Sequence, residues 1–345
     1  MRSDLPPLAR HLPAVLTASL ALLVLAMTIS IGLGTVWLPP ADVWAALAGA
    51  PAEPSHAHIV LGLRLPRTII AALAGALLAL AGASLQSATR NDLADPSLIG
   101  VTSGGALAIV ATLYLTGRDH LTGPLAILLA FAGGLAISAL IWALAWRHSH
   151  ASRHLVLSGV LISSIASALV SVLLILDGAL FASVLRWVVG SLSARTWHDV
   201  TTIAPAALLA IPLALALRPA LSALYLGEDI AAATGVRTTR ARAATLALAT
   251  FLTASAVSVV GAIGFVGLIG PHLARRLVGE HPARVLPLAG VLGALLLVGA
   301  DALAQALSLA FPTTDIAGRT ALPAGALTAI IGGPLLFALL IRNTR

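Results

Sequence analysis

Few residues in this chain have the types and spacing that could support chemistry. Two pairs, His56/His58 and His148/His150, have a His-x-His spacing that could hold a metal ion. They lie in predicted loops without a nearby carboxylate or cysteine, so we interpret them as solvated histidines. The glycine pattern GAIGFVG (261–267) has no strand–helix unit around it, and close packing of helices explains it better than nucleotide binding.

Other catalytic chemistry lacks its residues. The chain has no Cys, and all 20 of its basic Lys+Arg residues are Arg. A P-loop needs a Lys after its glycine-rich turn, so we predict that any ATP hydrolysis belongs to another subunit. Without Cys there are no disulfides, thiolate metal sites or Cys nucleophiles. Only Asp301 lies clearly inside a hydrophobic segment, whereas a proton-relay pump or membrane enzyme would carry more such groups. We therefore predict no catalytic residue, no metal and no cofactor bound by this chain.

The composition predicts a membrane protein. The chain has 345 residues, of which 59% are hydrophobic and 10% charged. Repeated apolar runs of about 20 residues indicate many membrane-spanning helices. We predict one all-α, polytopic transmembrane domain over residues 1–345, with about ten helices at 13–36, 67–87, 98–115, 121–146, 155–176, 199–217, 243–262, 264–278, 285–310 and 322–341.

The charge distribution predicts the orientation of these helices. With the N-terminus in the cytoplasm, 14 arginines fall in inner segments and 6 in outer ones. This bias follows the positive-inside rule, so we predict that both termini are cytoplasmic. The net charge of +7 is thereby explained by membrane topology and not by binding of nucleic acid.

Two predicted helices, 98–115 and 264–278, are short and interrupted by glycine. Each follows a normal helix, and the two helices that precede them have opposite orientations, which indicates an inverted repeat of the kind found in transporters. In the second of these segments, Gly and Pro at membrane depth free backbone groups that neighbouring protein has to satisfy. We expect a structural role for Gly264, Gly267, Pro271, His272 and Arg275, and we expect Asp301 to pair within the bundle.

Seven motifs in one order resemble the FecCD-type permeases of bacterial ABC importers, which take up ferric siderophores, haem or vitamin B12. They cover the chain from about residue 13 to its end. The motifs are RLPR (64–67), AGALLALAGASLQ (74–86), RNDLADPSLIGVTSGGA (90–106), GSLSARTW (190–197), LGEDIAAATGV (226–236), GAIGFVGLIGPHLAR (261–275) and LPAGALTAIIGGP (322–334).

The resemblance implies a type II ABC importer permease in the bacterial cytoplasmic (inner) membrane. It implies as partners membrane lipid, a second permease copy, separate ATPase subunits that bind ATP and Mg, and a periplasmic or lipid-anchored substrate-binding protein. The wording of the motifs at 90–106 and 184–197 favours ferric siderophores as cargo, with haem or vitamin B12 as alternatives. A pairing with a different permease chain stays open, and an ion-coupled secondary transporter is the alternative from another class.

The resemblance also assigns a coupling segment within the loop at about 218–242. Its motif matches the small cytoplasmic helix that docks into the ATPase in this family. A small-residue helix held by glycine turns would form a compact knob for a cleft, whereas the other interpretation is a solvated loop. The residues that carry the assignment are Leu226, Gly227, Glu228, Ala231, Gly235 and Val236.

Two further sites follow from the resemblance. Arg64 and Arg67 would pair with acidic residues of the binding protein, because a guanidinium group takes a carboxylate with two hydrogen bonds. The alternative is that both side chains reach into lipid headgroups. Ser152 and Arg153 would lie at the cytoplasmic gate, or in an ordinary inner loop.

The chain departs from the family in two places. Asp92 stands where the family's pattern has proline, and Ala321 stands where it has an acid, after an apparent insertion at 311–320.

Overall fold

The computed structural model describes residues 11–118, 124–145, 151–177, 188–310 and 322–343. Within these ranges every regular element is helical, which confirms the all-α prediction. The elements are α1 Leu12–Gly32, α2 Pro40–Leu47, α3 Pro54–Ala57, η2 His58–Arg64, α4 Leu65–Thr89, η3 Pro96–Ile99, α5 Val101–Thr116, α6 Pro124–Ala145, α7 Ala151–Leu176, α9 Trp197–Ala216, α10 Arg218–Leu226, α11 Glu228–Ala233, α12 Thr238–Val260, α13 Val266–Val278, α14 Pro282–Ala310 and α15 Ala324–Asn343.

Each of the ten predicted membrane segments coincides with one of these helices. Seven helical stretches are long and apolar enough to cross a membrane by themselves: Leu12–Gly32, Pro54–Thr89, Pro124–Leu144, Leu157–Leu176, Trp197–Ala216, Thr238–Val260 and Pro282–Ala310. The remaining segments correspond to α5, α13 and α15. Since α5 has 16 residues and α13 has 13, length alone does not make them spans, and the total of about ten spans stays a prediction.

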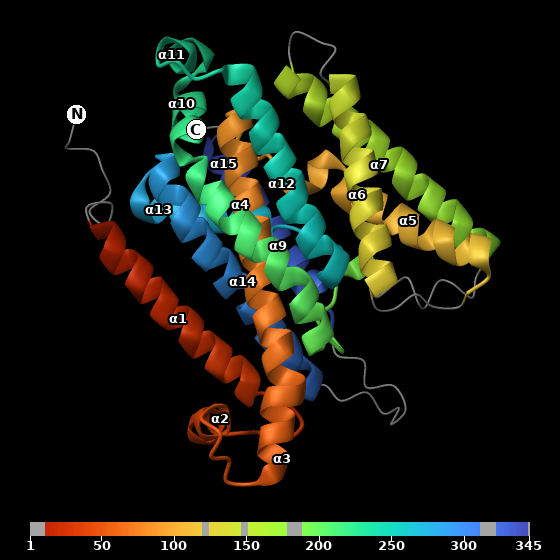
Figure 1. The fold of residues 1–345 in the computed structure, drawn as a ribbon, viewed down its shortest axis with the longest axis vertical. Helices are drawn as coiled ribbons and strands as arrows, with labels where there is room; N and C mark the ends of the chain where they lie inside the picture. Colours follow the sequence, from red (N-terminus) through yellow and green to blue (C-terminus); the bar gives the residue numbers. More distant parts are fainter. Residues whose placement is uncertain (1–10, 119–123, 146–150, 178–187, 311–321, 344–345) are drawn as a thin grey trace.

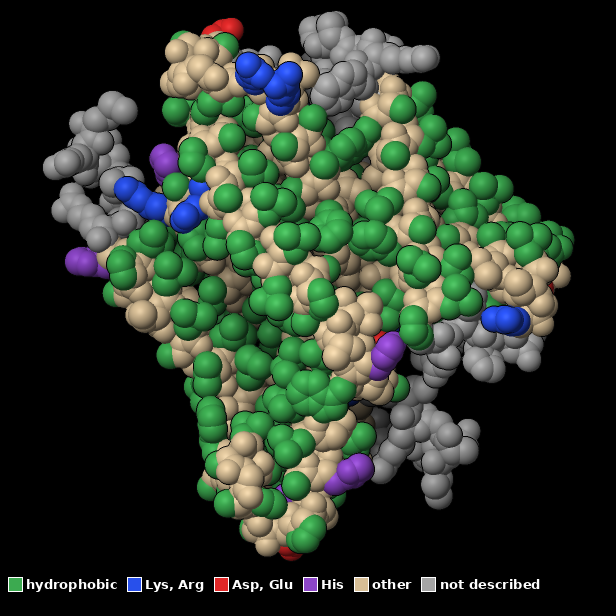
Figure 2. Space-filling view, in the orientation of Figure 1, with side chains coloured by type: hydrophobic (Ala, Val, Ile, Leu, Met, Phe, Trp, Pro, Cys, Tyr) green, Lys and Arg blue, Asp and Glu red, His purple; other side chains and the backbone are tan. Residues whose placement is uncertain are grey.

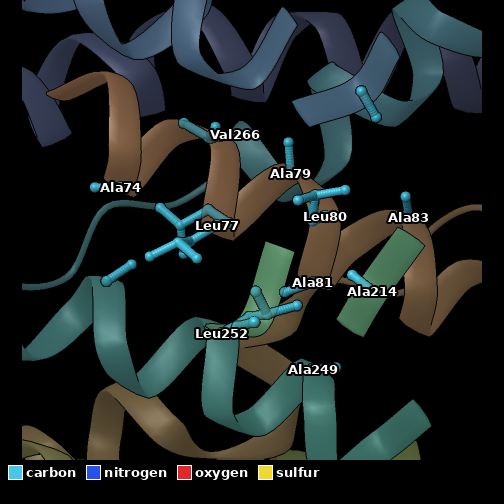
Figure 3. Close-up of a cluster of buried hydrophobic side chains, with 14 of the residues drawn as sticks. Ala74, Leu77, Ala79, Leu80, Ala81, Ala83, Ala214, Ala249, Leu252 and Val266 are labelled. Atoms are coloured by element: carbon cyan, nitrogen blue, oxygen red, sulfur yellow. The ribbon is translucent and has the colours of Figure 1, made fainter. Parts of the chain in front are cut away.

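Helix α4 is the centre of the molecule. It packs against α14, α12, α13 and α9, which lie around it in Figure 1. Every residue of α4 from Leu77 to Ala88 is buried. Figure 3 shows the small side chains of α4 beside Ala249 and Leu252 of α12 and Ala214 of α9. The Ala and Gly residues of α4 let neighbouring helices approach it closely, and this explains its central position.

Two glycine contacts determine how closely the neighbours approach α4. A Cβ atom on Gly82 would overlap the carbonyl oxygen of Gly267 in α13, and one on Gly75 would overlap that of Gly293 in α14. Backbones can come this close only where both helices carry small residues, which is a frequent way of packing helices within membranes. The two glycine pairs hold α4, α13 and α14 together as one body.

Helices α5, α6 and α7 form a second group beside this body (Figure 1). They share a small hydrophobic cluster made of Ala106, Ile109, Val110, Leu113, Ala130 and Val170. The group contacts the central body mainly through α12, which packs on α6 and α5. The short η3 helix leads from the end of α4 into α5.

Short helices lie at the two ends of the bundle. Helices α10 and α11 are at one end, and α2 and α3 are at the other (Figure 1). The face shown in Figure 2 is largely hydrophobic between these ends, with the charged side chains near the ends and edges. This distribution is that of a bundle surrounded by lipid.

The packing of α14 on α4 can be tested by adding one methyl group. We expect Gly293→Ala to lower the midpoint of thermal unfolding, because the new Cβ would overlap the Gly75 carbonyl and the Ala79 side chain. The control is Gly299→Ala in the same helix, where a Cβ meets nothing within 4 Å. Equal midpoints for both variants in lipid nanodiscs would contradict this account of the packing.

Candidate functional site

A groove of about 630 Å³ lies between α5 and α7. Its lining includes seven hydroxyl side chains, and none of the described residues that line it is charged. The hydroxyl groups are those of Ser97 in η3, Thr102 and Ser103 in α5, and Ser163, Ser164, Ser167 and Ser171 in α7. Val188 and Ala262, from two chain segments of the central body, complete the wall. The groove therefore lies where the second group of helices meets the central body.

The hydroxyl groups of the groove differ in their hydrogen bonds. Ser103 donates to the Gly100 carbonyl at 3.1 Å, and Ser171 donates to the Ser167 carbonyl at 3.0 Å. Their oxygens remain available as acceptors. The Ser163 Oγ atom is buried and has no partner in the structure. A buried hydroxyl without a partner costs free energy, so this one is suited to a water molecule or a polar solute.

Our sequence analysis did not identify this groove. The pattern that indicates it is the spacing of Ser163, Ser167 and Ser171, which are four residues apart. Residues at this spacing share one face of a helix. A hydroxyl stripe within an apolar helix predicts a polar surface, unlike the charged and glycine-rich motifs on which the predicted sites rest.

The predicted coupling segment forms a short helical hairpin at one end of the bundle. Helix α10 ends at Leu226, and α11 is only 6 residues long. Leu226 and Ile230 have 60% and 48% of their surfaces exposed, while Ala231 is fully buried. The hairpin thus packs Leu221, Leu224 and Ala231 inward and leaves Leu226 and Ile230 exposed.

Two glycines bound this short helix. Gly227 has φ 125° and Gly235 has φ 81°, in the region that L-residues with side chains rarely adopt. Val236 follows, and its N–H donates to the Ala231 carbonyl at 3.0 Å. The predicted glycine turns are therefore confirmed. The side chain of Glu228 lies outside what the structure describes, so its part in docking stays a prediction.

Arg64 has partners within the chain. Its Nη1 donates to the carbonyls of Ile31 at 2.7 Å and Gly32 at 3.0 Å, and its Nη2 donates to Val36 at 2.6 Å. These carbonyls lie at and after the C-terminus of α1, where backbone oxygens lack helical partners. A cation at this end also interacts favourably with the helix dipole. Arg64 therefore joins α1 to the start of α4.

Arg67 forms a buried ion pair with Asp301. Its Nε and Nη2 donate to the two carboxylate oxygens at 2.8 and 2.7 Å, and Gln305 donates a third hydrogen bond at 3.0 Å. The side chain of Asp301 is 1% exposed and that of Arg67 is 17% exposed. This confirms that Asp301 pairs within the bundle, and it connects α4 to α14. Both guanidinium groups thus have partners within this chain. Docking of a partner protein by Arg64 and Arg67 stays a prediction.

The predicted structural residues of α13 meet α4 and the loop that follows it. Pro271 lacks the N–H that would bond the Gly267 carbonyl one turn earlier. The freed oxygen accepts a hydrogen bond from Gln86 Nε2 at 3.2 Å. Arg275 donates to Gln86 Oε1 at 2.7 Å. As expected, a backbone group freed by proline is bonded by a neighbouring helix. The residue that bonds it, Gln86, was not among the predicted site residues.

The remaining predicted residues of this region differ in their surroundings. His272 accepts a hydrogen bond from Arg276 Nε at 3.1 Å on the outer side of α13. Gly264 lies in the turn before α13, and its carbonyl accepts from Val266. The predicted gate residues Ser152 and Arg153 lie in the first turn of α7, and their side chains are outside the described part, as are residues 311–321.

One expectation about the histidine pairs is wrong. His56 has two carboxylates nearby, with Asp42 at 3.9 Å and Glu53 at 3.7 Å, because α2 and α3 fold back onto each other. Among the described residues no group of three His, Cys, Asp or Glu could hold a metal ion. His148 and His150 fall outside the described ranges.

The ion pair between α4 and α14 gives a prediction of stability. Arg67→Ala should destabilise the fold by about 3–5 kcal/mol, because it leaves the Asp301 carboxylate buried without a counter-charge. Arg67→Met combined with Asp301→Leu should recover most of this loss. Unfolding in detergent would be followed by circular dichroism, with the exposed Arg276→Ala as the control. A loss no greater than that of the control would mean that the pair does not stabilise the bundle.

Comparison with known proteins agrees with this architecture. The model of the FecCD transport family matches residues 22–342. The Fe(3+)-citrate import system permease protein YfmE of Bacillus subtilis (strain 168) is 37% identical over 333 residues, 96% of this chain and 95% of the relative. The cobalamin import system permease protein BtuC of Halobacterium salinarum is 34% identical over 289 residues, 83% and 74% of the two chains. A solved inward-facing structure, assigned to the metal-chelate type of ABC transporter, aligns with a TM-score of 0.82 at 30% identity, over 96% of this chain and 99% of that chain. The chain therefore belongs to the FecCD transport family.

Proposed function

We propose that this chain is the membrane-spanning permease of an ABC importer for ferric siderophores. The family and the ferric-citrate relative support this function. The observation that carries it is the hairpin of α10 and α11, which displays large apolar side chains at one end of a bundle of membrane helices. Exposed apolar residues rimmed by polar ones are typical of a docking surface for another protein.

The proposed assembly contains two copies of this permease, two copies of an ATPase and a substrate-binding protein. The distribution of arginines supports a cytoplasmic position for both termini and for the hairpin. The missing Lys supports a separate ATPase, since this chain has no P-loop. In this arrangement the hairpin docks into the ATPase, and closure of the ATPases moves α11 relative to the bundle.

The groove between α5 and α7 is the proposed surface along which cargo passes. Hydroxyl groups can both donate and accept hydrogen bonds, so they solvate a polar cargo without holding it through charge. Weak contacts are an advantage in a transporter, because the cargo has to leave the protein as well as enter it. The cargo is moved without chemical change, and selection of the siderophore belongs to the binding protein.

Two alternatives concern the cargo and the source of energy. Haem or vitamin B12 as cargo has the support of the cobalamin relative, and the uncharged groove would accept either. Ion-coupled transport requires a carboxylate that binds and releases its ion. Among the described residues the carboxylates of Asp301 and Asp199 are buried. Arg67 neutralises Asp301 through two hydrogen bonds, and Asp199 caps α9 and lies 3.7 Å from Arg195. We therefore do not propose ion coupling.

The docking role can be tested at Gly235. Gly235→Trp should reduce co-purification of the ATPase at least about tenfold, because a large side chain and a strained φ are placed next to the exposed face of α11. The matched control is Gly117→Trp at the end of α5. Gly117 also has a positive φ, 62°, and both glycines have open space around them.

The control separates docking from folding. Both variants place a Trp at a glycine with positive φ and open space, so both should give monodisperse protein in similar yield. Loss of the ATPase from the Gly235 variant alone supports docking by this hairpin. Equal recovery of the ATPase with both variants would show that the partner binds elsewhere.

The proposed cargo surface can be tested at Ser167. Ser167→Trp should abolish most ATP-driven uptake into proteoliposomes while the ATPase still co-purifies, because the indole fills the groove far from the docking hairpin. The control is Leu208→Trp in α9, where the side chain is 76% exposed on the outside of the bundle. Wild-type uptake by the Ser167 variant would exclude this groove as the path of the cargo.

A further inference from the structure

We propose that Arg275 is the positioning residue that transmits movement of the coupling hairpin to the loop 91–97 at the edge of the hydroxyl groove. It does so through its contacts with Gln86 and Asp92. This inference rests on the proposed function, because it requires an ATPase that moves the hairpin. It assigns the connection between the coupling hairpin and the hydroxyl groove to the side chains of Arg275, Gln86 and Asp92.

The first part of the connection joins the hairpin to α13. Helix α11 packs mainly on α10, so movement of α11 reaches α10 first. The Tyr225 hydroxyl, two residues before Gly227, donates a hydrogen bond to Glu280 Oε2 at 2.8 Å. Glu280 lies just beyond the C-terminus of α13. Partial burial and the neighbouring Glu280 raise the pKa of Tyr225 to about 12, so the phenol stays a donor at physiological pH.

The second part joins α13 to the end of α4. The Arg275 side chain is only 9% exposed, and its Nη2 lies 2.7 Å from Gln86 Oε1 and 3.6 Å from Asp92 Oδ1. Gln86 is buried and uses its amide group fully. Besides accepting from Arg275, it donates to the carbonyls of Ala94 and Gly267, each at 3.2 Å. A buried amide with both N–H groups and its oxygen bonded joins α4 to α13 and to the loop that follows α4.

The third part joins this amide to the groove. The loop 91–97 is short and held by its own hydrogen bonds. Ala94, which accepts from Gln86, also donates to the Asn91 carbonyl at 3.0 Å. Asp95 accepts from the Ser97 N–H at 2.8 Å, and Ser97 lines the groove. A displacement of Gln86 therefore reaches the wall of the groove through a segment with little freedom to absorb it.

Arg276 differs from Arg275 in its exposure and in its contacts. It is the next residue of the same helix, but its side chain is exposed and bonds only His272, four residues earlier in α13. Arg275 instead touches α4 and the loop after it. Asp92, which replaces the proline of the family's pattern, adds a charge 3.6 Å from Arg275. The charge-assisted hydrogen bond from Arg275 to Gln86 is directional, so it resists relative displacement of α13 and α4 better than apolar packing does.

The test measures cargo moved per ATP hydrolysed in proteoliposomes that contain the permease, its ATPase and the binding protein. Arg275→Gln should lower this ratio about tenfold while the ATPase still co-purifies and still responds to the binding protein. Arg275→Lys, which keeps the charge and one donor, should recover part of it. Arg276→Gln should leave the ratio unchanged. A residue that only stabilised the fold would lower the yield of the complex and not the ratio.

Two gentler substitutions keep the inference testable if Arg275→Gln does not fold. Tyr225→Phe removes one hydroxyl, and Asp92→Asn removes one partly exposed charge. Each should lower the ratio, and their combination should lower it no further than the stronger single change, because both act on one connection. Independent, multiplying effects would overturn the proposal, as would a wild-type ratio in Arg275→Gln. Absence of ATP-driven uptake by the wild-type complex would instead overturn the proposed function itself.

Discussion

A helix that is buried on every side within a membrane has to be held by close packing, since lipid tails are as apolar as its own side chains. Helix α4 meets this requirement with small residues. Its contacts with α13 and α14 bring backbone against backbone at Gly82 and Gly75, which no larger residue would allow. The central body follows from this core, because α9, α12, α13 and α14 are arranged around one helix.

Polar side chains act at the two ends of the same helix. At the N-terminal end of α4 Arg64 bonds the carbonyls at the end of α1, and Arg67 pairs with Asp301 of α14. At the C-terminal end of α4 Gln86 bonds α13 and the loop that follows α4. The bundle between them is closely packed, and the group of α5, α6 and α7 contacts it mainly through α12. The hydroxyl-lined groove between α5 and α7 lies where this group meets the bundle.

Much of this architecture could be predicted from the sequence, because hydropathy and arginine placement are properties of single segments. Each predicted membrane segment coincides with a helix, and the two glycine turns around α11 are present. Asp301 was expected to pair, since an isolated charge in a membrane costs several kcal/mol. Its partner Arg67 could not be predicted, because the two residues are 234 positions apart and only the fold brings them together.

The same reason explains the features that the sequence analysis missed. Gln86 has no unusual neighbours in sequence, and its role appears only when Pro271 frees the Gly267 carbonyl beside it. His56 acquires Asp42 as a neighbour through the folding of α2 and α3. The serine stripe of α7 was visible in the sequence. However, it could be recognised as the wall of a groove only once α5 was placed opposite it.

The central claim is that ATP hydrolysis by a partner drives cargo across this bundle. The most direct measurement is uptake of iron-55, given as a ferric siderophore, into proteoliposomes that hold the permease, its ATPase and its binding protein. We expect uptake that requires ATP and that disappears when a hydrolysis-deficient ATPase is used. Uptake driven by a proton or sodium gradient without ATP would contradict it.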